Sequence, residues 1–167
     1  MQRTSFAGMH CSLARGLELI GDWWSPLIIR DLFLGVVRFD ELTEDLGISR
    51  NLLTRRLASL LKSGVIERTP YQRRPTRYEY RLTEAGRDLV PALLALTAWG
   101  DRWARPKEGT PILFVHSACG HRFEPQVVCS ACGGLIDADS VAAAPGPGGA
   151  AKAGTRIVAK RLGKRPA

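Results

Sequence analysis

The sequence lacks an apolar run of the roughly 18 to 20 residues that a membrane-spanning helix needs, which excludes a transmembrane protein. The residues after Met1 lack the apolar core of a signal peptide, so we expect a cytoplasmic protein. A glycine-rich phosphate loop is missing and few carboxylates lie near a histidine, which excludes a large α/β enzyme in a chain of 167 residues. Cysteine is scarce. In a reducing compartment, the four cysteines favour thiol chemistry or metal binding over a disulfide framework.

Positive charge is concentrated in two stretches of the chain. Residues 49–81 hold nine basic and two acidic side chains, and residues 140–167 hold six basic and no acidic ones, within a net charge of +8. A basic stretch inside a patterned segment favours a polyanionic partner, most often nucleic acid. A solvated helix face is the plainer interpretation.

Apolar spacing predicts a mainly helical amino-terminal region. The helices are expected over residues 12–21, 25–35, 38–46 and 50–62. We expect Ser25 to cap the second helix, with Pro26 in its first turn. Gly47 permits a left-handed turn after the third helix. The segment 38–62 is therefore a helix, a tight turn and a basic helix, the arrangement of a helix-turn-helix that lays its second helix in the major groove.

Two strands are predicted after the basic helix, over residues 65–69 and 77–82, around a proline-bounded loop at 70–76. A hairpin in this place is a wing, whose arginine-bearing tip reaches a phosphate strand or the minor groove. Alternatively, these arginines only add solubility. A further helix is expected over residues 84–103, and its wide apolar stripe packs either on the core or against a second subunit.

A cysteine-rich extension occupies residues 106–139. Two short Cys/His knuckles, each followed by glycine, resemble a zinc ribbon, because a two-residue gap brings two ligands onto one turn. The candidate ligands are Cys119, Cys129, Cys132 and either His116 or His121, with the spacing in favour of His116. We expect a structural rather than a catalytic zinc ion, because metal supplies the folding energy of a segment with little core. The alternatives are a ribbon that has lost its metal and a free dithiol.

Several motifs occur in the order found in a known family. They are GDWWSPLIIRDL at 21–32, RFDEL at 38–42, Gly47-Ile48-Ser49, the wing residues Tyr71, Pro75, Arg77 and Glu79-Tyr80, and then Leu93 and Trp99-Gly100. With Cys11 ahead of the first helix, they resemble the HxlR-type winged helix-turn-helix regulators over residues 11–105. The resemblance implies a mainly α (α+β) winged helix-turn-helix fold and a bacterial transcription regulator, acting as a repressor at promoter DNA in the nucleoid. It also implies a homodimer formed through the first helix and the helix at 84–103.

The same resemblance assigns the site residues. On the basic helix, the residues that face DNA are Ser49, Arg50, Asn51, Thr54 and Arg55. In the wing they are Arg73, Arg74, Thr76 and Arg77. Arginine bonds guanine edges and asparagine bonds adenine edges, whereas we expect the wing residues to hold phosphates or the minor groove. Arg56 serves either phosphate or an internal salt bridge. Cys11 either senses an effector or oxidant or packs at the dimer interface.

These predictions divide the chain into four parts. They are an N-terminal arm (1–10), a DNA-binding and dimerisation domain (11–105), the zinc-ribbon-like extension (106–139) and a basic tail (140–167) whose composition predicts disorder. The leading function is a sequence-specific DNA-binding regulator and not an enzyme. One alternative is an adaptor that binds a protein through the ribbon. The other is a thiol-disulfide enzyme using Cys129 and Cys132, which leaves the basic helix unexplained and lacks a thioredoxin-like strand before the motif.

Overall fold

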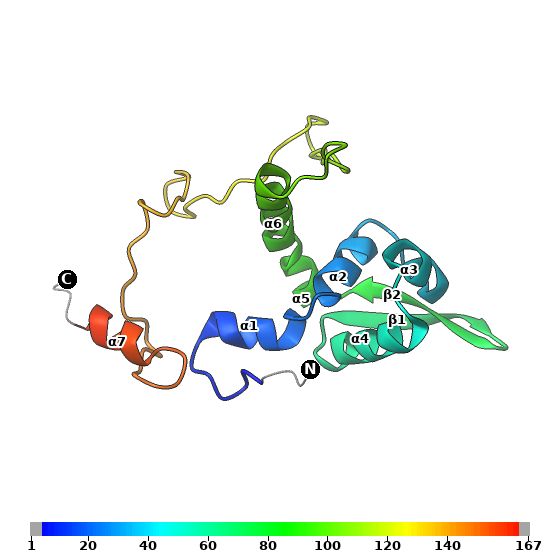
Figure 1. The fold of residues 1–167 in the computed structure, drawn as a ribbon, viewed down its shortest axis with the longest axis horizontal. Helices are drawn as coiled ribbons and strands as arrows, with labels where there is room; N and C mark the ends of the chain where they lie inside the picture. The colour runs from blue at the N-terminus through cyan, green and yellow to red at the C-terminus, as the bar shows by residue number, and fades with distance from the viewer. Residues whose placement is uncertain (1–4, 164–167) are drawn as a thin grey trace. The chain divides into compact units, whose positions relative to one another are not determined.

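The computed structural model describes residues 5–163. The chain forms two compact units, Met1–Thr83 with Ala142–Ala167 and Glu84–Val141 (Figure 1). None of the helices within residues 5–163 combines the length and the apolar character that crossing a membrane requires.

The first unit is built around a helix-turn-helix and a hairpin. Its elements are α1 (Ser12–Ile20), α2 (Ser25–Phe33), α3 (Phe39–Leu46), α4 (Arg50–Lys62), β1 (Ile66–Arg73), β2 (Thr76–Leu82) and α7 (Arg156–Leu162). The fully buried apolar side chains come from α2, α3 and α4 and are Ile28, Ile29, Leu42, Leu53, Leu57 and Leu60. Each contributes about 1.5–3 kcal/mol through burial. The leucine spacing of α4 therefore fixes which face of that helix turns outward.

The turn between α3 and α4 confirms the prediction from Gly47-Ile48-Ser49. Gly47 has φ 60° and ψ 22°, in the left-handed region where a side chain is strained. Ile48 is buried, and the Ser49 hydroxyl accepts a hydrogen bond from the backbone N–H of Leu52 at 3.4 Å. The turn thereby sets the start of α4 at Arg50.

The start of α2 corrects the prediction that Ser25 is its cap. The Asp22 carboxylate accepts hydrogen bonds from the backbone N–H groups of Trp24 at 2.9 Å and Ser25 at 3.0 Å. Ser25 is fully buried and donates its own hydroxyl to Asp22. A carboxylate at this position satisfies the first free N–H groups of the helix and complements its dipole, so Asp22 is the capping side chain.

The wing is longer than predicted. The strands β1 and β2 run antiparallel from Ile66↔Leu82 to Arg73↔Thr76, so the predicted loop at 70–76 is mostly strand. Pro70 is accommodated because the sheet has only two strands and the register shifts between Pro70 and Gln72, which are the edge and bulge positions where proline is tolerated. The hairpin therefore places its basic tip further out from the core.

The predicted helix at 84–103 is two helices in the second unit, α5 (Glu84–Asp88) and α6 (Val90–Trp103). Pro91 has no backbone N–H and sits in the first turn of α6, where that donor is not needed. No residue of α6 is buried in its unit, and Leu96, Trp99 and Trp103 are 57%, 59% and 67% exposed. The apolar stripe is therefore available to a further partner.

The tail contains the helix α7, which composition did not predict. The segment 156–162 has neither glycine nor proline and consists of residues that favour or tolerate a helix, although glycine and proline dominate the residues before it. No residue of α7 is buried.

Candidate nucleic-acid interface

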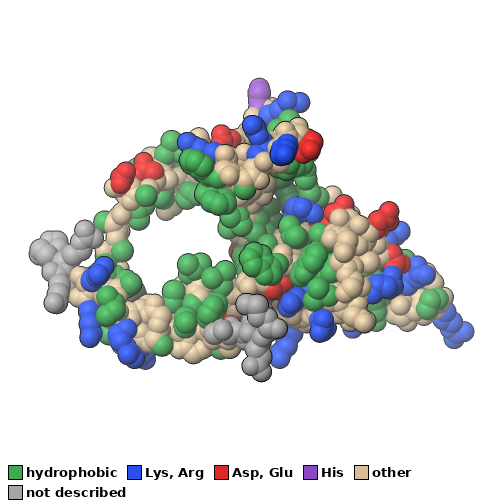
Figure 2. Space-filling view, viewed as in Figure 1, with side chains coloured by type: hydrophobic (Ala, Val, Ile, Leu, Met, Phe, Trp, Pro, Cys, Tyr) green, Lys and Arg blue, Asp and Glu red, His purple; other side chains and the backbone are tan. Residues whose placement is uncertain are grey.

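The outward face of α4 holds the residues assigned to DNA. Ser49, Arg50, Asn51, Thr54 and Arg55 are all exposed, while Leu53, Leu57 and Leu60 anchor the opposite face. Figure 2 shows basic side chains gathered over the region of α4 and the hairpin. This brings the helix residues together at the amino-terminal half of α4, the part of a recognition helix that reaches base edges.

These five residues differ in how they are engaged. The Ser49 hydroxyl caps the helix, and the Thr54 hydroxyl donates to the Arg50 carbonyl at 2.9 Å. The side chains of Asn51 and Arg55 have no hydrogen bond or ion pair within the part of the chain that the structure describes. Asn51 and Arg55 are therefore the two side chains of the five whose polar groups have no partner among the described residues.

Arg50 is held by an acidic neighbour that the sequence analysis did not consider. Its guanidinium donates to Asp40 at 2.7 Å and lies 4.8 Å from the ring centre of Phe39. Arg77 of the wing approaches the same carboxylate at 3.8 Å. The hydrogen bond from Arg50, aided by the charges of both arginines, lowers the pKa of Asp40 below its usual value. Arg50 must leave this carboxylate, or share it, in order to bind DNA.

A notch of about 310 Å³ lies between the start of α4 and the wing. Its lining combines two basic side chains, one carboxylate and four aromatic rings, namely Arg50, Arg77, Asp40, Phe39, Tyr71, Tyr78 and Tyr80, together with Thr76. The ring of Phe39 holds the Arg50 guanidinium in place through cation–π attraction, which suits a phosphate contact.

Arg56 has an internal role. Its Nε lies 3.2 Å from the Asp22 carboxylate, so the two side chains form an ion pair, although this nitrogen makes no hydrogen bond. Asp22 caps α2 and is 9% exposed, so the pair ties α4 to the start of α2. Of the two alternatives for Arg56, the structure shows the internal salt bridge.

The tip of the wing carries the basic residues assigned to it. Arg73 and Arg74 are exposed, and their guanidinium groups have no partner in residues 5–163. Their carbonyls shape the turn, because Thr76 donates to the Arg73 carbonyl at 3.1 Å and Gln72 donates to the Arg74 carbonyl at 3.0 Å. The turn thus depends on backbone contacts, and the guanidinium groups are left for solvent or phosphate.

Arg38, whose role no sequence pattern predicts, joins the wing to the helix-turn-helix. Arg38 donates to Glu79 through Nε at 3.2 Å and through a second nitrogen at 3.1 Å, and it lies 4.7 Å from the ring centre of Tyr71. The hydrogen bond from Arg38, and to a smaller extent the one from Arg81, lowers the pKa of Glu79. The backbone N–H of Tyr80 also donates to the Val37 carbonyl at 2.9 Å. These contacts hold the wing in a defined position beside α3.

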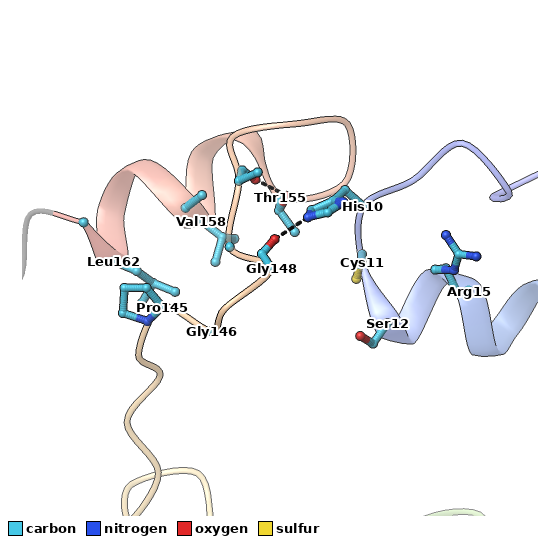
Figure 3. Close-up of a pocket in the computed structure, with 14 residues that line it drawn as sticks. His10, Cys11, Ser12, Arg15, Pro145, Gly146, Gly148, Thr155, Val158 and Leu162 are labelled. Carbon is cyan, nitrogen blue, oxygen red and sulfur yellow. Dashed lines mark hydrogen bonds between the residues drawn. The ribbon is translucent and has the colours of Figure 1, made fainter.

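Cys11 precedes α1 and lines a cavity of about 670 Å³ in the first unit (Figure 3). The thiol is half-buried, and the other walls come from Arg15, α7 and the loop that leads to α7. His10 holds this loop, because its ring donates to the Gly148 carbonyl and its backbone N–H donates to the Ala153 carbonyl at 2.7 Å. A small molecule has access to the thiol through this cavity.

The candidate metal ligands form two separate pairs in the second unit. His116 Nδ1 lies 3.4 Å from Cys119 Sγ. Cys129 is hydrogen-bonded by the backbone N–H of Ala131 and then by Cys132, and these bonds lower the pKa of the Cys129 thiol. Among the residues that the structure describes, no three His, Cys, Asp or Glu side chains gather into one metal-binding group. His121 belongs to neither pair.

Comparison with known proteins gives consistent matches. The family model of the HxlR-like helix-turn-helix matches residues 19–108. An uncharacterised HTH-type transcriptional regulator of Mycobacterium tuberculosis is 47% identical over 141 residues, which cover 84% of this chain and 89% of that protein. This alignment is too long to leave out residues 106–139, so the relative extends over the cysteine-rich segment as well.

Solved structures agree with this assignment. The structure of PA1607, described as a candidate transcription factor, has a TM-score of 0.74 and 34% identity, and the match covers 84% of this chain and 99% of that one. The oxidised form of the redox regulator HypR has a TM-score of 0.51 and 32% identity over 55% of this chain and 96% of its own. The mainly helical winged helix-turn-helix predicted from the sequence is confirmed. The chain belongs to the HxlR-like helix-turn-helix family, a family of transcriptional regulators and not of enzymes.

Proposed function

We propose that the protein is a sequence-specific repressor that binds promoter DNA in the nucleoid as a homodimer. The observation that carries the proposal is the pair of exposed, unengaged side chains Asn51 and Arg55 on the amino-terminal half of α4. An arginine that bonds the two acceptors of guanine, or an asparagine that bonds adenine, discriminates against a wrong base by about 1–3 kcal/mol. Two copies of α4, one from each subunit, read two half-sites one helical turn apart.

The wing supplies affinity that does not depend on sequence. Arg73 and Arg74 at its tip contact phosphates or the minor groove, and Arg77 and Arg50 contact phosphate from the notch beside Asp40. Each neutralised phosphate releases condensed counterions, so binding becomes weaker as salt rises. Repression follows when the bound dimer occupies DNA that RNA polymerase needs.

The experiment that tests this function is a salt titration of DNA binding with the double variant Arg73→Ala, Arg74→Ala. We first select genomic fragments that the full-length protein retains, and then measure affinity by fluorescence anisotropy. The slope of log affinity against log salt should become shallower by about 1 for each phosphate that the variant no longer neutralises, hence by up to about 4 for the two wings of a dimer. The turn should persist, because backbone carbonyls of these residues hold it.

The matched control removes two exposed basic side chains that are not assigned to the interface, in the variant Arg105→Ala, Lys107→Ala. This variant should keep the slope of the wild type. A wild-type protein that retains no duplex at modest salt contradicts the proposed function, and an unchanged slope in the wing variant removes the wing from the interface.

We propose as a second function that Cys11 adjusts DNA binding in response to an oxidant. The specific observation is the cavity that brings solvent to its half-buried thiol beside Arg15 and the start of α1. The name of the similar protein HypR, a redox regulator, supports the same function. Hydrogen peroxide would transfer one oxygen to the Cys11 thiolate, leaving a sulfenic acid and hydroxide.

Peroxide treatment should change operator affinity of the wild type by roughly 5- to 150-fold, the usual range of coupling between two sites. The Cys11→Ser variant should bind DNA as the reduced protein does and should not respond. Ser12→Ala, at the neighbouring residue that lines the same cavity, is the matched control and should keep the response. Equal responses of wild type and Cys11→Ser would exclude Cys11 as the sensor.

A further inference from the structure

The cysteine-rich extension contains an internal repeat. The sequence VHSACGHR at 115–122 recurs as VCSACGGL at 128–135, with five of eight positions identical. When the two copies are aligned, His116 corresponds to Cys129, and Cys119 corresponds to Cys132. His121 corresponds to Gly134.

The two copies fold in the same way. Each is a tight turn closed by one bridge, Val115↔Arg122 in the first and Val128↔Leu135 in the second. The glycines that follow Cys119 and Cys132 both have a left-handed backbone conformation, with φ 70° at Gly120 and 72° at Gly133.

The backbone hydrogen bonds correspond as well. In the first turn, His116 N–H donates to the His121 carbonyl at 2.9 Å and Gly120 N–H donates to the His116 carbonyl at 2.8 Å. In the second turn, Cys129 and Gly133 make the equivalent bonds, both at 2.8 Å, to Gly134 and Cys129. Sequence and geometry therefore describe one structural unit that occurs twice.

Each turn holds one pair of candidate ligands, His116 with Cys119 in the first and Cys129 with Cys132 in the second. The distance of 3.4 Å between His116 Nδ1 and Cys119 Sγ is close to the separation of roughly 3.5 Å that tetrahedral angles give for Zn–S bonds of about 2.3 Å and Zn–N bonds of about 2.0–2.1 Å. In the second turn, which has the same bridge and the same backbone hydrogen bonds, Cys129 and Cys132 occupy the positions of His116 and Cys119.

The extension has no core that would otherwise hold the two turns. No residue between 104 and 141 is buried, and Leu113, Val115 and Leu135 are 57%, 55% and 61% exposed. A segment of this size needs a cross-link or a bound metal ion to stabilise its fold in place of hydrophobic burial. Backbone hydrogen bonds thus hold each ligand pair by itself, and no buried core joins the two pairs.

We propose that the two turns close on a single zinc ion, held by His116, Cys119, Cys129 and Cys132. The repeat assigns the fourth ligand to His116, because the position of His121 is a glycine in the second copy, where only the backbone carbonyl is used. Binding of the ion displaces the three thiol protons, and three thiolates with one neutral imidazole give a closed tetrahedral site. No coordination position is left for substrate, so the metal is structural.

The test uses the full chain, purified without chelator from zinc-supplemented cells. Elemental analysis should give about one zinc ion per chain. Replacement of zinc by cobalt should give the visible absorption of a tetrahedral site and a thiolate-to-cobalt band in the near ultraviolet. Cys129→Ser should lose the zinc, whereas Cys11→Ser, the matched control outside the repeat, should retain it.

Two histidine variants test the ligand assignment without depending on loss of fold. His121→Ala should keep one zinc ion per chain and an unchanged cobalt spectrum. His116→Cys should also keep the metal but strengthen the thiolate-to-cobalt band, because a fourth sulfur joins the site. Zinc-free protein with a Cys129–Cys132 disulfide, or a cobalt spectrum that His116→Cys leaves unchanged, would overturn the proposal.

Discussion

The substitution Arg55→Ala is expected to weaken binding to the specific DNA site by about 1–3 kcal/mol for each half-site, which is roughly a 5- to 150-fold loss of affinity. Arg55 is exposed on the outer face of α4 and has no partner within the described residues that the substitution would disrupt. The temperature midpoint of unfolding should therefore remain that of the wild type. Fluorescence anisotropy on the selected fragment and a thermal melt measure the two quantities.

A conservative variant separates base contact from phosphate contact at this position. Arg55→Lys keeps the charge but loses the planar pair of donors that bonds the two guanine acceptors. If Arg55 bonds a base, Arg55→Lys should lose specific affinity and retain nonspecific affinity. If Arg55 bonds phosphate, the lysine should substitute for it, and Arg55→Ala should weaken all sequences alike and reduce the salt slope by about 1 for each subunit, hence by about 2 for the dimer.

Arg105→Ala, in an exposed segment of the second unit, is the matched control and should behave as wild type. Specific affinity unaffected by Arg55→Ala would remove this residue from the site and leave Asn51 as the base-contacting side chain. Specific affinity lost together with stability would instead assign Arg55 a structural role.

The helix-turn-helix could be predicted from the sequence because its determinants are local. The leucines of α4 recur at helical spacing and are buried where that spacing places them, and Gly47 has the left-handed conformation that the turn needs. The wing was predicted in the right place but too short. Proline in a strand is unfavourable in general, and only the two-stranded sheet with its shifted register makes Pro70 acceptable.

The engagement of individual site residues could not be predicted. Arg50 and Arg55 are both exposed arginines of one helix, and nothing in their spacing distinguishes them. The structure distinguishes them because α3 brings Asp40 to within 2.7 Å of Arg50. In the same way, the choice of Arg56 for an internal ion pair depends on Asp22 lying beside α4, which is a tertiary contact.

The apolar face of α6 leads to the second prediction, that the double variant Leu96→Glu, Trp99→Glu converts the proposed homodimer into a monomer. These side chains are 57% and 59% exposed in a helix with no buried residue, and large aromatic side chains are typical anchors of subunit interfaces. In the first unit, Leu13 of α1 is 72% exposed, so both helices that the family resemblance assigns to the dimer present apolar surface. Burial of a glutamate pair in such an interface is strongly unfavourable.

Loss of the dimer should lower operator affinity far more than loss of one base contact. A dimer binds its second half-site as an intramolecular event, and this linkage raises affinity by roughly 10²- to 10⁴-fold. Leu96→Glu, Trp99→Glu should lose that factor while each monomer keeps an intact α4 and wing. Sedimentation velocity and anisotropy on full and half operators measure the two effects, and affinity for a half operator should not change.

Lys107→Glu is the matched control, because it introduces negative charge at an exposed position beyond the end of α6 and should leave the dimer intact. A variant that remains dimeric would place the interface elsewhere in the chain. Two unlinked copies of α4 cannot gain affinity from the spacing of their half-sites. A variant that is monomeric but binds the full operator as tightly as the wild type would therefore show that DNA recognition does not require the dimer.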